Sequence, residues 1–288
     1  MFNNTKNTTI DFSNKSLMRL PDGFGQNLPS LTSLNLHYNQ LTSLPAGFGR
    51  VLSNLKFLYL HINQLTSLPV GFGQNLPNLT YLVLDNNQLT SLPDGFGQNL
   101  PKLECLFLNN NKLTSLPDGF GQNLLKLKYL HIHNNQLTNL PDGFLSNLPN
   151  LEDLYLDNNQ LTNLPDGFGR VLSNLPNLKK LYIHNNRLTS LPDGFGHASS
   201  VPKLEYCNIL NDCNNEVKVI PQIKETLYNR TILHTTFKCV YAHSVIYKKV
   251  LDIIRTELDN YNARIYTKHA YKPPYGLVPN RLMREDLM

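Results

Sequence analysis

Histidine and aspartate side chains recur at one position of a regular pattern, and they are the side chains best suited to chemistry. His61 precedes Asp85 by 24 residues, and His133, Asp157 and His184 follow one another at intervals of 24 and 27. Imidazole and carboxylate groups suit zinc. On the open, gently curved surface predicted below they converge little, and no cysteine joins them, so we predict no metal or other cofactor. Because imidazoles become charged near pH 6.5 and each has an acidic neighbour, we expect a mild pH sensitivity of binding.

Signatures of catalysis are sparse. No serine, histidine and aspartate surround a nucleophile turn, and no glycine-rich loop could cradle a phosphate. Cys239 has His234 and His243 nearby in the sequence, which would suit a thiol nucleophile. We favour a structural cysteine in a buried strand and predict that the protein is not an enzyme. The alternative is that the repeats recognise a substrate, on which a small enzymatic segment at the C-terminus, similar to a ubiquitin ligase, then acts.

The elements that must position these side chains are copies of one unit. Each full copy reads LxxLxLxxNxLTxLPxGF, as in LTYLVLDNNQLTSLPDGF from Leu79 to Phe96. Inserted residues lie in Val171–Pro176 and His197–Pro202, on the side that returns to the next copy. A fixed period of 24 residues indicates a solenoid. The period is 24 residues six times and then 27 and 26, with copies that begin at Asn7, Leu31, Leu55, Leu79, Leu103, Leu127, Leu151, Leu178 and Leu204.

The alternation of leucines predicts a short strand in every copy. Leu82 and Leu84 point inward and Tyr81, Val83 and Asp85 outward, because side chains alternate along a strand. One strand cannot bury its apolar face alone, but stacked copies form a parallel sheet over a continuous core. Proline cannot donate to a ladder, so the returning side should be irregular, with glycine after aspartate allowing a positive φ. One phenylalanine per copy should stack into a spine of Phe24, Phe48, Phe72, Phe96, Phe120, Phe144, Phe168 and Phe195.

Seven full copies in register resemble the typical leucine-rich repeat family, over about residues 7–210. The resemblance implies an α/β-type repeat solenoid, a right-handed horseshoe with a parallel sheet on its concave face. It also implies a ladder in which asparagine side chains bond the backbone of each turn, at Asn39, Asn63, Asn87, Asn111, Asn135, Asn159 and Asn186. The near-identical, Trp-free copies, which contain Asn and Ile, further resemble leucine-rich repeat proteins of amoeba-infecting giant viruses. That resemblance implies a viral, cytoplasmic interaction module aimed at host proteins.

We divide the chain into an N-terminal capping repeat at 1–30, the solenoid at 31–213 and a basic α+β segment at 214–288. The solenoid is expected to end in a degraded ninth strand at Leu204–Asp212. Some bacterial leucine-rich repeat proteins carry a cysteine-dependent ubiquitin ligase domain after the repeats, but the segment here is much shorter and lacks a matching motif. The expected elements of this last segment are strands at Glu216–Ile220 and Thr231–Tyr241 and an amphipathic helix from about His243 to Tyr261.

Charge separates the two parts of the chain. Residues 1–213 carry as many basic as acidic side chains, so the whole net charge of +5 lies in residues 214–288. The balanced charge of the repeats therefore gives no reason to expect nucleic-acid binding, whereas the positive charge of the last segment gives a modest one. No apolar run approaches the roughly 18 residues that span a membrane, and the first residues lack the apolar core of a secretory signal.

Cysteine usage indicates a reducing compartment. The four cysteines do not form the paired caps of secreted leucine-rich repeat proteins. We expect a cytoplasmic monomer with a protein partner and without membrane contact.

The outward strand positions vary from copy to copy, whereas the residues exposed on the returning side are nearly identical. Both sets face water, so this contrast favours the concave face as the working surface. Exposed aromatic patches mark protein contacts, and we predict a non-catalytic scaffold that binds a protein there. The alternatives are aromatic rings that merely cover one another, and a last segment that contacts nucleic acid. The predicted contact residues are Phe57, Tyr59, His61, Tyr81, Asp85, Phe107, Tyr129, His131, His133, Tyr155, Asp157, Tyr182 and His184.

Overall fold

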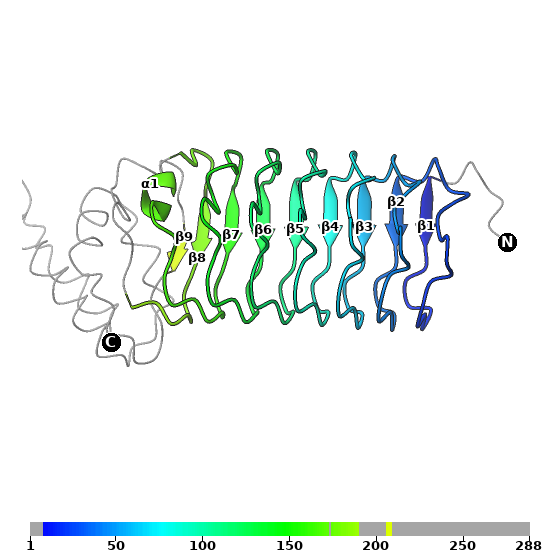
Figure 1. Cartoon of the computed structure of the whole chain (residues 1–288), viewed down its shortest axis with the longest axis horizontal. Helices are drawn as coiled ribbons and strands as arrows, with labels where there is room; N and C mark the ends of the chain where they lie inside the picture. The colour runs from blue at the N-terminus through cyan, green and yellow to red at the C-terminus, as the bar shows by residue number, and fades with distance from the viewer. Residues whose placement is uncertain (1–7, 173, 190–205, 209–288) are drawn as a thin grey trace, which may run out of the picture. The chain divides into compact units, whose positions relative to one another are not determined.

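Nine short parallel strands stack in sequence order into one sheet, as Figure 1 shows for the computed structural model. The strands are β1 (Thr9–Asp11), β2 (Ser33–Asn35), β3 (Phe57–Tyr59), β4 (Tyr81–Val83), β5 (Cys105–Phe107), β6 (Tyr129–His131), β7 (Asp153–Tyr155), β8 (Lys180–Tyr182) and β9 (Tyr206–Asn208). A five-residue helix, α1 (Phe168–Leu172), lies between β7 and β8 and overlaps the predicted insertion of this copy. The predicted leucine-rich repeat solenoid with a parallel sheet is confirmed.

The structure describes residues 8–172, 174–189 and 206–208. All of these residues lie in the first of two units of the chain, Met1–Val240. The strands and the helix predicted within 214–288 lie outside the described residues, as do Phe195 and Cys239. In the part of the chain that is described, no helix is long and apolar enough to cross a membrane.

The strands pair without any shift in register. The central leucine of each strand lies opposite that of the next, for example Leu82 opposite Leu106 and Leu106 opposite Leu130. The degraded ninth strand is confirmed, because β9 pairs with β8 and places Cys207 opposite Leu181. A constant register means that one position of the unit forms a row across the whole sheet.

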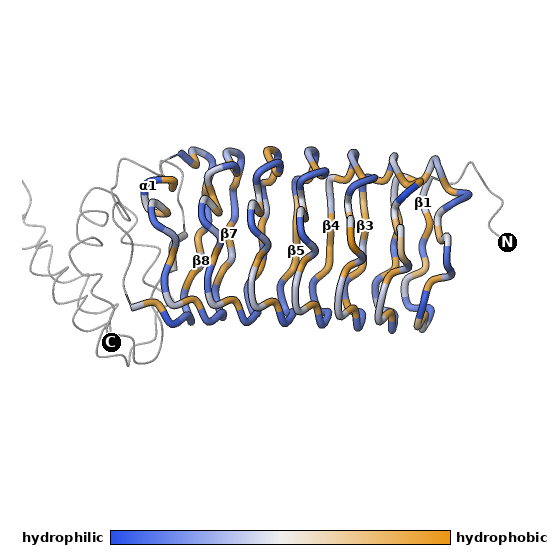
Figure 2. The backbone as a smooth tube through the Cα atoms, in the orientation of Figure 1, coloured by the Kyte–Doolittle hydropathy of each residue, from blue (hydrophilic) through white to orange (hydrophobic). Residues whose placement is uncertain are grey.

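The core lies between the sheet and the returning side. Leucines such as Leu106 and Leu108 are completely buried, and full burial of one leucine contributes about 2 kcal/mol. Figure 2 shows these apolar stretches recurring from coil to coil. The predicted aromatic spine is confirmed from Phe24 to Phe144, where successive rings stack with centroids 5.9–6.3 Å apart.

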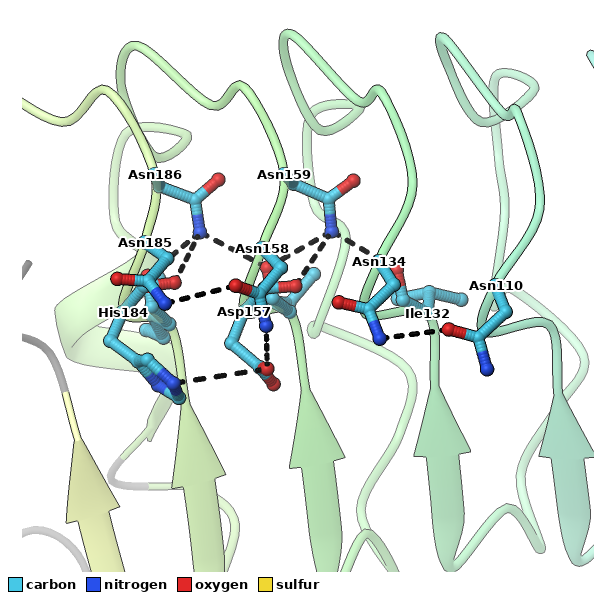
Figure 3. A network of polar contacts seen from close by, with 11 residues as sticks. Asn110, Ile132, Asn134, Asp157, Asn158, Asn159, His184, Asn185 and Asn186 are labelled. Carbon is cyan, nitrogen blue, oxygen red and sulfur yellow. Dashed lines mark hydrogen bonds and ion pairs between the residues drawn. The ribbon is translucent and has the colours of Figure 1, made fainter. Parts of the chain in front are cut away.

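The asparagine ladder implied by the resemblance is also confirmed. Nδ2 of Asn87 donates to the carbonyl oxygens of Leu60 and Leu84, at 3.0 Å each, and its Oδ1 accepts from the N–H of Leu65 at 3.0 Å. Each such side chain therefore joins its own turn to the preceding coil. Figure 3 shows two further members, Asn159 and Asn186. These bonds satisfy buried backbone groups that a three-residue strand leaves unpaired.

The returning side consists of turns, as the proline and glycine pattern predicts. Gly95 and Gly97 have φ of 69° and 91°, a region that residues with a Cβ atom rarely adopt. A Cβ atom on Gly97 would also lie 3.2 Å from the side chain of Leu124 in the next coil. Glycine at this position therefore allows successive coils to approach closely.

Candidate interaction surface

The sheet face is the surface formed by three rows of outward side chains. The strand register produces the two rows that the sequence predicts on the strands themselves. The first row contains Ser33, Phe57, Tyr81, Cys105, Tyr129, Asp153 and Lys180. The second row contains Asn35, Tyr59, Val83, Phe107, His131, Tyr155 and Tyr182. The third row follows just after the strands and contains His37, His61, Asp85, Asn109, His133, Asp157 and His184.

Side chains on this face are less exposed than outward positions suggest. All the predicted contact residues are half-buried except Asp157, which is buried with 7% of its surface accessible. Cys105 is also outward in register but buried, at 2%. It lies against Tyr81, and burial raises the pKa of its thiol. The rings predicted to form an exposed patch are therefore half-buried, because large neighbours in adjacent coils cover one another and the small residues between them.

The aromatic residues form two clusters. In the first cluster Phe57 lies 5.2 Å from Tyr81 between ring centroids, and Tyr59 makes an edge contact with His61 at 6.4 Å. His61 in turn stacks on His37 at 4.5 Å.

The second cluster is a continuous run of rings over four coils, from β5 to β8. The centroid distances are 4.7 Å from Phe107 to His131, 4.3 Å from His131 to Tyr155 and 4.6 Å from Tyr155 to Tyr182. His133 lies 5.7 Å from Tyr155, also between centroids. The small buried residues Val83 and Cys105 lie between the two clusters, so the single aromatic field of the sequence becomes two platforms. Tyr129 lies in the first row beside the second cluster.

Three ion pairs lie in or beside the first row: one joins two successive members of the row, and the other two join the residues just before it. Lys128 pairs with Glu104 at 2.8 Å and Lys180 with Asp153 at 3.0 Å. Lys179 pairs with Glu152 at 2.6 Å. Partly exposed pairs of this kind stabilise the fold little, but they neutralise this edge of the sheet face. Opposite charges one period apart in the sequence would have predicted them.

Two aspartates in the third row each accept a hydrogen bond from the asparagine that follows them. Nδ2 of Asn86 donates to Oδ2 of Asp85 at 2.6 Å, and Nδ2 of Asn158 donates to Oδ2 of Asp157 at 2.7 Å. His184 approaches the same Asp157 oxygen with its Nε2 at 3.9 Å (Figure 3). The asparagine after each aspartate has a positive φ of 54–55°. The spacing of the histidines and aspartates did not point to these asparagines.

The same asparagine position forms a second, exposed row of amides. Nδ2 of Asn134 donates to Oδ1 of Asn110 at 2.8 Å, and Nδ2 of Asn185 donates to Oδ1 of Asn158 at 2.9 Å (Figure 3). This row lines one side of the third row, so polar groups flank the aromatic platforms.

Burial keeps three imidazoles neutral. It lowers the pKa of His131 to about 4. It also lowers the pKa of His61 and of His133, although Asp85 and Asp157 act in the opposite direction. The expectation that these histidines become charged near pH 6.5 is therefore wrong, because desolvation outweighs the neighbouring carboxylates.

Some buried polar atoms of the second and third rows have no hydrogen-bond partner. Among the described residues, the buried side-chain atoms without a hydrogen bond are His61 Nδ1, His131 Nε2, His133 Nδ1, Asp157 Oδ1 and His184 Nδ1. All five belong to the sheet face, so the hydrogen bonding of this face is incomplete in the protein alone.

The sheet places His133, Asp157 and His184 on successive coils, as predicted. Within the described ranges, no three histidine, cysteine, aspartate or glutamate side chains are arranged to hold a metal ion. Cys239 and its flanking His234 and His243 lie outside those ranges. The predicted alternatives of an enzymatic or nucleic-acid-contacting last segment rest on residues outside them as well.

Comparisons with known proteins match the repeats. The family model described as "Leucine rich repeat" matches residues 8–65, 53–113, 77–131, 101–161 and 125–188. A search of curated proteins finds no significant match.

Solved structures with similar coils come from several organisms. The leucine-rich effector protein YopM of Yersinia pestis is 34% identical over 71% of this chain, with a TM-score of 0.52. The Drosophila Toll–Spatzle complex gives 29% identity over 76% of the chain and a TM-score of 0.64, and a leucine-rich repeat protein of Leptospira interrogans gives 31%, 77% and 0.50. The chain spans 55%, 29% and 65% of the lengths of these three structures, respectively.

Proposed function

The chain belongs to the leucine-rich repeat family, and from this premise we propose that it is a non-catalytic scaffold that binds a protein partner on the sheet face. The family and the repeat fold suit a protein interaction scaffold. A cytoplasmic site of action, a host protein as partner and a monomeric state belong to the same proposal. The cysteine usage supports the cytoplasmic site of action, and the style of the repeats in the sequence suggests the host partner.

The observation that carries the proposal is the run of rings from Phe107 through His131 and Tyr155 to Tyr182. These rings contact one another across four coils, with centroids 4.3–4.7 Å apart. Because each ring is held by its neighbours, little conformational freedom remains to be lost when a partner binds. Tyrosine is enriched at the energetic centres of protein interfaces, since it combines a large apolar surface with a polar hydroxyl group.

The returning side offers a partner much less variety. Its exposed positions repeat nearly the same residues from copy to copy, whereas the sheet face differs in every coil. The matched Drosophila structure is a complex of Toll with Spatzle, which supports partner binding as a use of such coils.

Affinity capture from a cell lysate tests the proposal. The baits are the intact protein and a variant with Tyr59→Ala, Phe107→Ala and Tyr155→Ala, which removes rings from both clusters. The matched control carries Gln74→Ala, Gln98→Ala and Gln122→Ala, three exposed residues of the returning side. Circular dichroism must show that all three baits are folded.

We expect a protein that the intact chain and the control retain and that the aromatic variant loses. Equal capture by all three baits would contradict binding on the sheet face.

A further inference from the structure

Two places in the third row have the same construction. Each combines a histidine of one coil, an aspartate of the next coil and the asparagine that follows this aspartate. The first place consists of His61, Asp85 and Asn86, and the second of His133, Asp157 and Asn158. In both, the asparagine Nδ2 donates to Oδ2 of the aspartate, at 2.6 and 2.7 Å. We name them the Asp85 site and the Asp157 site.

Among the described residues, neither carboxylate is neutralised by a lysine or arginine. The lysines near the sheet face, Lys128, Lys179 and Lys180, form ion pairs with other acids. His184 lies 3.9 Å from Asp157 and compensates it only when protonated. Burial keeps His61 and His133 neutral around pH 7, because it lowers their pKa. Each site therefore presents a negative charge beside a neutral imidazole.

Hydrogen bonding is incomplete at both sites, and more so at the Asp157 site. Nδ1 of His61 and Nδ1 of His133 are buried and unpartnered. Oδ1 of Asp157 is also unpartnered, in a side chain of which 10% is accessible. Buried polar atoms are nearly always satisfied in folded proteins. An ionised carboxylate only accepts hydrogen bonds, and a neutral imidazole Nδ1 accepts in the tautomer that carries its proton on Nε2, so a hydrogen-bond donor would satisfy these atoms.

A guanidinium group fits these acceptors. It carries five N–H donors in a planar fork, and it also stacks on aromatic rings. A tyrosine lies beside the imidazole at each site, Tyr59 beside His61 and Tyr155 beside His133, with centroids 6.4 and 5.7 Å apart. Lysine provides three donors on a compact, strongly hydrated ammonium and lacks the flat face for stacking.

We propose that the Asp85 and Asp157 sites bind two arginine side chains of one partner segment. This inference rests on the proposed function, because it specifies the chemistry of the protein that the sheet face binds. Small rotations of the imidazoles and of Asp157 bring their covered acceptors to the arginines.

The distance between the sites defines the spacing of the two arginines. Asp85 follows β4 and Asp157 follows β7, three strands further along the sheet. At about 4.8 Å per strand the sites lie about 14 Å apart, the distance that four residues of extended chain span at about 3.3 Å each. Residues four apart in an extended segment also point to the same side. The partner segment therefore presents arginines at positions i and i+4 as it crosses the strands.

Synthetic peptides test this chemistry directly. The probe is a fluorescein-labelled glycine–serine peptide with arginines at i and i+4. One comparison peptide has citrulline, which is neutral and nearly isosteric, at both positions. A second has its arginines at i and i+2, too close together to reach both sites. Fluorescence anisotropy measures the binding of each peptide to the full-length chain.

Isosteric variants locate the binding on the protein. Asp85→Asn and Asp157→Asn remove one charge each, separately and together. The matched control is Asp94→Asn with Asp166→Asn, two carboxylates on the returning side that are also three coils apart. The control loses the same net charge without touching the proposed sites.

We expect the i and i+4 arginine peptide to bind about fiftyfold more tightly than the citrulline peptide, which lacks both charges, and about fivefold to tenfold more tightly than the i and i+2 peptide, which reaches only one site. Each single variant should weaken this binding about fivefold to tenfold, which corresponds to one desolvated ion pair. The double variant should bind the arginine and citrulline peptides equally, and the control should stay within about twofold of the wild type. Binding should also weaken as salt is added.

Equal affinity for the arginine and citrulline peptides would overturn the inference, as would no detectable binding at millimolar peptide. So would a double variant that still prefers arginine. Lysate capture separates this failure from that of the proposed function. A partner lost by the aromatic variant but retained by the double aspartate variant would leave the scaffold proposal intact and remove this one.

Discussion

At the scale of single residues, the third row is followed by a position where the backbone is left-handed in every coil whose turn the structure describes. Asparagine occupies this position from β4 onward, and it tolerates a left-handed φ because its short amide can bond locally. Two early coils have other residues there, Tyr38 with φ of 53° and Ile62 with φ of 52°. A β-branched residue in this region is a true outlier. Tyr38 and Ile62 therefore store strain on the edge of the sheet face.

Replacing Ile62 by asparagine should stabilise the fold. The substitution relieves the left-handed strain, and it loses only the contacts of a half-buried side chain. We expect a gain of about 1 kcal/mol in the free energy of unfolding, measured by urea denaturation. The reverse change, Asn86→Ile, should cost a similar amount. If Ile62→Asn destabilised the protein, packing and not backbone conformation would decide this position.

The imidazole of His131 should make stability depend on pH. Its pKa in the folded protein is about 4, below the value of about 6.5 that an unfolded chain has. The unfolded state therefore binds the proton more tightly. This contribution to stability is fully present above about pH 6.5 and is lost as the pH falls towards 4.

The measurement is the free energy of unfolding at pH 7.5 and at pH 5, compared with the variant His131→Phe. The ring of His131 is half-buried, so we expect the wild type to lose of the order of 1 kcal/mol more than the variant over this range. Nuclear magnetic resonance of the imidazole provides an independent check. A His131 ring that titrated near its ordinary pKa would contradict the prediction.

At the scale of elements, each strand is only three residues long, and its turn holds it in place. The asparagine ladder connects the turn of one coil to the backbone of the coil before it. Asn111 accepts from the N–H of Leu89 and donates to the carbonyl oxygens of Leu84 and Leu108, each at 3.0 Å. One side chain therefore satisfies buried groups in two coils.

Asn111→Ala should be among the most destabilising polar-to-alanine changes in the chain. It leaves the backbone N–H of Leu89 and buried carbonyl oxygens unpaired, which costs about 2–4 kcal/mol in total. The control is Asn123→Ala, which removes one exposed bond to the carbonyl oxygen of Gln98 and should cost less than about 0.5 kcal/mol. Urea denaturation measures both. Equal losses would mean that water replaces the ladder bonds.

At the scale of the whole solenoid, the strands pair only in the order β1 to β9. Stability is then close to a sum over coils and the interfaces between neighbours. β1 lies at one end of the strand order and has one neighbouring strand, β2, whereas β5 is enclosed by β4 and β6. The central leucine of β5, Leu106, is fully buried, and Ile10 of β1 retains 9% of its surface.

Amide hydrogen exchange should therefore be faster in β1 than in β5. An end coil opens by breaking one interface, while a central coil must break two. We expect exchange at Thr9–Asp11 to be at least about tenfold faster than at Cys105–Phe107. Mass spectrometry of peptides that cover the two segments measures the difference. Equal protection would mean that the solenoid unfolds as one cooperative unit.

The amino-acid sequence by itself determined the strands, their register, the aromatic spine and the membership of each row. It could do so because a constant period makes one unit predict every other, so that the spacing of the copies alone places Tyr155 beside Tyr182. The alternation of leucines decides which side is buried, and this follows from strand geometry alone. The degraded ninth strand was predicted at Leu204–Asp212 from the same spacing, and β9 lies there at Tyr206–Asn208.

Only the tertiary structure decided how the side chains of one row use the space between them. The burial of Cys105 and Asp157, the division of the rings into two clusters and the neutral state of His131 depend on the sizes and rotamers of neighbours one coil away. These neighbours are distant in sequence and vary between copies, so the period that predicts their positions does not predict their contacts.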